Sequence, residues 1–85
     1  MEQATPLNLT ASALVKTGAG RLAGMYVNST SAGTIKFWNN TSAAGTVINN
    51  TITPAIGYHN LGNVSFTTGL YATIGGTLDV TLHYA

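Results

Sequence analysis

The sequence predicts an all-β fold: a small antiparallel β-sandwich, jelly-roll-like, with about eight short strands. Three observations lead to this prediction. Apolar and polar residues alternate along several segments, as in strands with one buried face. Helical spacing of apolar residues is nearly absent, because Gly, Thr and Asn interrupt every stretch. Turn residues separate the apolar runs at intervals of roughly 8–12 residues, which is typical of sandwiches and small barrels.

The last predicted strand has the clearest pattern. Within residues 77–84 every second residue, from Leu78 to Tyr84, is apolar, and the residues between them are polar. This alternation predicts a half-buried strand with one core face and one outer face. Gly75 and Gly76 precede it and predict a tight turn.

Seven further strands are predicted upstream from the same alternation and from flanking Gly, Asn or Pro residues. One of them, residues 21–28, is apolar on both faces, which predicts a central strand or one covered on both sides. The seven are residues 12–17, 21–28, 34–38, 46–53, 56–61, 63–67 and 70–74.

Residues 12–85 are therefore expected to form one β-sandwich domain. Residues 1–11 lack clear alternation and contain Pro6. We expect this segment to be an extended N-terminal arm that lies on a neighbouring molecule or stays mobile.

The charge content is unusually low for a protein of this kind. Only 6% of the 85 residues are charged, against about 25% in typical soluble domains. The outer surface must then consist of Thr, Asn, Ser and Gly, which suits a permanent contact in an assembly. A chain this short has a small core, and without cysteine it has no disulfide to stabilise it. We therefore expect partner subunits to cover its surface.

Composition also excludes several partners. A net charge of +1, with three Lys and Arg residues, gives no basic stripe for nucleic acid. No apolar run approaches the ~20 residues of a membrane-spanning helix, and the N-terminus does not resemble a targeting segment. The expected product is soluble and made in the cytoplasm.

Catalytic groups are too few for an enzyme, and no cofactor is expected. Glu2 and Asp79 are the only acids, and Glu2 lies in the predicted arm. Asp79 and His83 share a strand face but lie about 13 Å apart at roughly 3.3 Å per residue, so both are expected to be solvated. His59 is expected to bond backbone; the alternative is one imidazole of a metal site shared around a three-fold axis.

Aromatic residues are the best candidates for contacts. The segment from Trp38 through Asn40 is a candidate for a carbohydrate contact, although burial of such aromatics at a subunit interface is the preferred interpretation. The arm supplies further candidates for a contact with a neighbour. The residues predicted at an interface are Pro6, Leu7, Leu9, Trp38, Tyr58 and Tyr71.

Several segments resemble small β-rich proteins of tailed bacteriophages and prophages. The resemblance extends over about residues 12–85 and lies in turn and strand patterns. The segments that carry it are residues 15–22, 27–28, 33–48, 66–72 and 79–84.

The resemblance implies a virion structural role, most of all a capsid decoration or cement protein. Similar proteins sit as trimers on the outside of the shell, so the implied partners are the major capsid protein and further copies of this chain. The alternative function is a host-glycan-binding module of a tail fibre, spike or head fibre. It requires an exposed aromatic patch around Trp38, Tyr58 or Tyr71.

Overall fold

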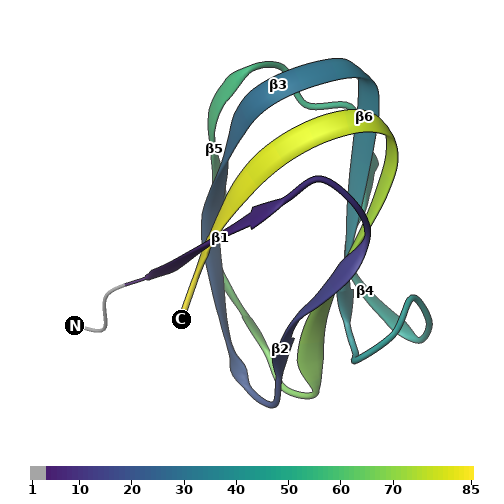
Figure 1. The fold of residues 1–85 in the computed structure, drawn as a ribbon. Helices are drawn as coiled ribbons and strands as arrows, with labels where there is room; N and C mark the ends of the chain where they lie inside the picture. The colour runs from purple at the N-terminus through teal and green to yellow at the C-terminus, as the bar shows by residue number, and fades with distance from the viewer. Residues whose placement is uncertain (1–3) are drawn as a thin grey trace.

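Two long antiparallel strands, β3 and β6, form the centre of the fold and arch over together (Figure 1). The computed structural model describes residues 4–85, which form one antiparallel six-stranded sheet. The strands are β1 (Thr5–Leu9), β2 (Ala13–Thr17), β3 (Gly20–Asn39), β4 (Thr46–Ile52), β5 (Gly57–Phe66) and β6 (Gly69–Tyr84).

Because β3 and β6 bend at the same level, the sheet divides into two parts. In the first half-sheet, residues 20–31 of β3 pair with residues 77–84 of β6, and β1 and β5 lie at the edges. In the second half-sheet, residues 34–39 of β3 pair with residues 69–75 of β6, and β2 and β4 lie at the edges.

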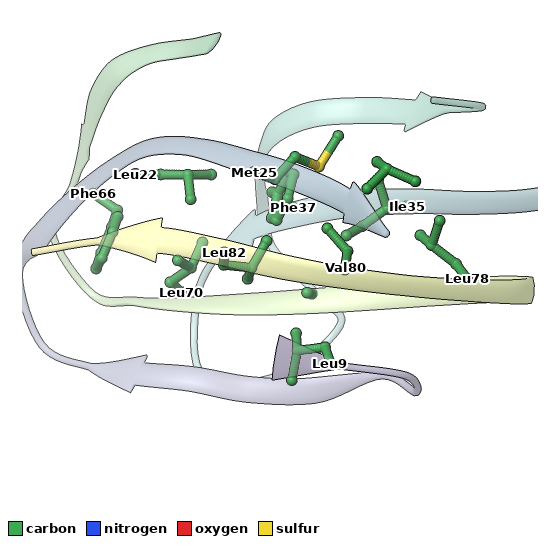
Figure 2. Close-up of a cluster of buried hydrophobic side chains, with 12 residues drawn as sticks. Leu9, Leu22, Met25, Ile35, Phe37, Phe66, Leu70, Leu78, Val80 and Leu82 are labelled. Atoms are coloured by element: carbon green, nitrogen blue, oxygen red, sulfur yellow. The ribbon is translucent and has the colours of Figure 1, made fainter. Parts of the chain in front are cut away.

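Side chains from both half-sheets form one hydrophobic core (Figure 2). The core members from β3 and β6 alternate along each strand, as the pleat requires. Each fully buried side chain of this size contributes about 1.5–3 kcal/mol of transfer free energy. The core consists of Leu9, Leu22, Met25, Val27, Ile35, Phe37, Phe66, Leu70, Ala72, Leu78, Val80 and Leu82.

The shared bend is made by residues with little or no side chain. The β3–β6 register slips between Ser31 and Thr34, and Ala32 and Gly76 adopt positive φ angles of 54° and 66°. A Cβ atom added to Gly33 would lie 2.6 Å from the Thr77 carbonyl oxygen, so the two backbones approach closely. Glycine inside a strand commonly marks such a bulge or sharp bend.

The prediction of eight short strands is corrected to six, because three predicted pairs are continuous. Residues 21–28 and 34–38 both belong to β3, and residues 56–61 and 63–67 both belong to β5. The third pair, residues 70–74 and 77–84, forms β6.

The tight turn predicted at Gly75 and Gly76 was wrong for a related reason. These glycines lie inside β6, where pairing with β3 continues on both sides of them. They bend the strand instead of ending it.

The predicted N-terminal arm is also corrected where the structure describes it. Thr5–Leu9 form β1, an edge strand paired with the end of β6. Leu9 is 8% exposed, and Leu7 packs against the core. Pro6 fits there because an edge strand tolerates a residue without a backbone N–H. The part of that arm formed by residues 1–3 lies outside the described residues.

Candidate functional site

The outward-facing side chains of each half-sheet form a candidate contact surface. The first outer face covers the first half-sheet and is made of Asn8, Tyr26, Asn28, Tyr58, Asp79, Thr81 and His83. The second outer face covers the second half-sheet and is made of Leu14, Lys36, Trp38, Val47, Tyr71 and Thr73.

The second outer face carries a row of apolar side chains across four strands. Tyr71 on β6 is the Cα partner of both Leu14 on β2 and Trp38 on β3, and Trp38 is also the partner of Val47 on β4. Directly opposed residues in antiparallel strands share a face, so the four side chains lie side by side. The row spans three interstrand spacings, about 14 Å. Leu14 at one end is 44% exposed.

Trp38 is held in place within this row. Its indole Nε1 donates a hydrogen bond of 2.9 Å to Oγ1 of Thr73, so the polar atom of the side chain is satisfied. The ammonium of Lys36 lies 4.4 Å from the centroid of the indole ring, within cation–π range. The ring is therefore fixed before any partner arrives, which lowers the entropic cost of a contact.

The first outer face has a pair of exposed aromatic rings. Tyr26 on β3 and Tyr58 on β5 are Cα partners, with exposed fractions of 46% and 52%. Tyr58 lies over Gly24, where an added Cβ would come within 2.6 Å of the Tyr58 ring carbon Cζ. The ring centroid of Tyr58 is 5.8 Å from that of His83. An aromatic ring that covers a strand glycine stabilises the sheet and is itself positioned by it.

A polar cluster lies beside the tyrosines. One oxygen of Asp79, Oδ1, accepts hydrogen bonds from Nδ2 of Asn8 at 2.7 Å and from Nδ2 of Asn28 at 3.1 Å. Asn28 Nδ2 also donates to Oγ1 of Thr81 at 3.1 Å. Oδ2 of Asp79 takes part in neither bond to the asparagines. Sequence reasoning missed this cluster because its members come from three strands that are far apart in the chain.

The asparagines of the segment from Trp38 to Asn40 serve the fold. Oδ1 of Asn39 accepts hydrogen bonds from the backbone N–H groups of Thr67 and Thr68 at 3.1 and 2.9 Å. Nδ2 of Asn40 donates to the carbonyl of Ala44 at 2.8 Å. Both amides hold turns, so the segment does not present a tryptophan with two available amides.

Replacing Asn39 with alanine is expected to lower the free energy of unfolding by about 1–2 kcal/mol, because the β5–β6 turn loses its acceptor. Asn39→Asp keeps an oxygen at that position and is expected to lose much less. Urea unfolding of the three proteins measures the difference. Equal stability of wild type and Asn39→Ala would show that water replaces the amide at no cost.

The predicted interface residues do not form one patch. Trp38 and Tyr71 meet on the second outer face, whereas Tyr58 lies on the first. Pro6 is exposed on β1 opposite His83. Leu7 and Leu9 face the core, so their side chains do not form a surface for a partner.

His59 is used within the chain. Its Nε2 atom lies 2.7 Å from the carbonyl oxygen of Ala55, which agrees with the expected bond to backbone. Among residues 4–85, no three His, Cys, Asp or Glu side chains gather closely enough to hold a metal ion.

No protein-family model, curated protein or solved structure matches the chain. In the described part of the chain, no helix has the length and apolar character needed to cross a membrane.

Proposed function

We propose that this protein is a virion structural protein of a tailed bacteriophage, a capsid decoration or cement protein. It is made in the host cytoplasm, binds the outside of the shell and stabilises the shell by bridging major capsid subunits. The role involves no chemical reaction, cofactor, nucleic acid or membrane. The observation that carries the proposal is the apolar row of the second outer face, which lies on a surface with very little charge.

The row is suited to a lasting protein contact. Aromatic residues and a neighbouring aliphatic side chain are the usual anchors of protein interfaces. Trp38 and Tyr71 stand at its centre, with Leu14 and Val47 at its ends. Lys36 is the one charged residue of this face. A contact of this kind depends little on salt, because screening acts on charges.

The proposed fold type agrees with such a role. We propose that the sheet is a jelly roll, a double-sheet arrangement of eight segments in two Greek keys. When β3 and β6 are each divided at their bend, the chain has eight segments. In chain order, the first half-sheet contains segments one, eight, three and six, and the second contains two, seven, four and five. This interleaved order supports the jelly roll over a simple meander.

We further propose that the protein is a homotrimer whose three second outer faces contact the shell. The support is the small core of an 85-residue chain without cysteine and the lack of charge to keep copies apart. Three linked contacts bind far more tightly than one, so weak individual contacts suffice to hold the shell.

Purified protein is expected to sediment as a trimer in analytical ultracentrifugation and to co-sediment with phage heads that lack it. Leu14→Asp places a charge in the apolar row and is expected to weaken head binding at least tenfold while the trimer persists. Tyr26→Ala on the first outer face is the control and is expected to bind heads as wild type does. A protein that stays monomeric and does not bind heads would contradict the proposal.

The alternative, a host-glycan-binding module of a tail fibre, spike or head fibre, has support from one specific observation. The exposed Tyr26–Tyr58 pair is an aromatic patch of the kind that this function requires.

A further inference from the structure

We infer that the first outer face is a binding site for a neutral glycan. The site combines the exposed tyrosine pair with the polar cluster centred on Asp79. It lies on the opposite set of outward side chains from the proposed shell contact. The inference therefore goes beyond the proposed function and does not depend on it.

The tyrosine pair supplies a flat apolar platform. One face of a pyranose ring exposes C–H groups, and these pack on aromatic rings whose hydroxyl groups remain hydrated. The Cβ atoms of directly opposed residues lie roughly 5 Å apart, so Tyr26 and Tyr58 form a continuous surface. Tyr58 is held over Gly24 and against His83, so little conformational entropy is lost when a ligand binds.

The polar cluster supplies hydrogen-bond acceptors next to the platform. The amide groups of Asn8 and Asn28 donate to Asp79 and so fix the carboxylate in place. This leaves oxygen atoms of the same three side chains facing outward as acceptors for sugar hydroxyl groups. Asp79 lies two residues from Thr81 on β6, and Thr81 is the Cα partner of Tyr26. Platform and acceptors are thus adjacent.

The charges of this face select a neutral ligand. Asp79 is its only carboxylate, and none of the three Lys and Arg residues belongs to it. An anionic sugar would meet the Asp79 carboxylate with no Lys or Arg to offset the repulsion. A neutral sugar instead donates hydroxyl protons to that carboxylate, which forms strong charge-assisted hydrogen bonds.

The test begins with fluorescently labelled wild-type protein on an array that displays neutral and anionic glycans. A neutral oligosaccharide bound there is then titrated in monovalent form by isothermal titration calorimetry. Tyr26→Ala and Asp79→Asn are each expected to weaken its affinity about tenfold or more, because each removes one half of the site. Tyr26→Phe keeps the ring and is expected to stay within about threefold of wild type.

Matched controls separate this site from the shell contact and from misfolding. Leu14→Asp alters the other outer face and is expected to bind the oligosaccharide as wild type does. Circular dichroism establishes that each variant is folded. The inference is overturned if no neutral glycan binds, if anionic glycans bind better, or if Tyr26→Ala and Asp79→Asn bind as wild type. It is also overturned if Tyr26→Ala dissociates the oligomer, because the face would then be a contact between copies.

Discussion

Replacing Ile35 with alanine is expected to lower the free energy of unfolding by about 2–5 kcal/mol. Ile35 is completely buried on β3, close to the bend that the two half-sheets share. The substitution removes three carbon atoms from a closely packed core and leaves a cavity that the neighbours fill only in part. A domain of this size has a total stability of only about 5–10 kcal/mol, so a large share is lost.

Ile56 provides the matched control, because it is the same residue type with 64% of its side chain exposed. Ile56→Ala is expected to change the free energy of unfolding by no more than about 0.5 kcal/mol. Denaturant unfolding of both variants at one protein concentration measures the difference, since association would otherwise shift the apparent stability. Similar losses for the two variants would mean that Ile35 is not the closely packed core residue described above.

The sequence predicted the strands but not their continuity. Alternation in residues 77–84 correctly assigned Leu78, Val80 and Leu82 to the core, because a strand with one buried face repeats every two residues. The same local pattern cannot tell a turn from a bend. Gly75 and Gly76 have the composition of a hairpin turn, and only their pairing with β3 shows that the strand continues.

The first strand was missed because it is stabilised by distant residues. Within residues 1–11, only Leu7 and Leu9 alternate, which is too short a pattern to predict a strand. Their partners, Leu82 and Val80, lie more than 70 positions away in the chain. Register with a remote strand is a tertiary property and leaves no local signal.

The candidate site was predictable only in its residue types. Tyr58 and the Trp38–Tyr71 combination were expected to form contacts, and both tyrosines and the tryptophan are on outer faces of the sheet. The asparagines that surround Asp79 were not expected, because asparagine is frequent throughout this sequence. One signal was available: Gly24 lies within an apolar strand, where a glycine marks a place that another group covers.

The bend shared by β3 and β6 makes the second large prediction. Gly76→Ala is expected to cost about 3 kcal/mol or more of unfolding free energy, for two reasons. Gly76 has a φ of +66°, a region that costs an L-residue about 1–2 kcal/mol. In addition, the new methyl group would collide with the backbone carbonyl of Ala32, so β3 would have to move.

Gly18→Ala separates these two contributions. Gly18 has a φ of +89°, but a Cβ there would meet no atom within 4 Å. Its substitution is therefore expected to cost only the conformational part, about 1–2 kcal/mol. The difference between the two variants, measured by urea unfolding, is the free energy with which the close approach at Ala32 holds the two half-sheets at their bend. If Gly76→Ala loses no more stability than Gly18→Ala, the bend adapts freely, and the two outer faces are not fixed relative to one another by this contact.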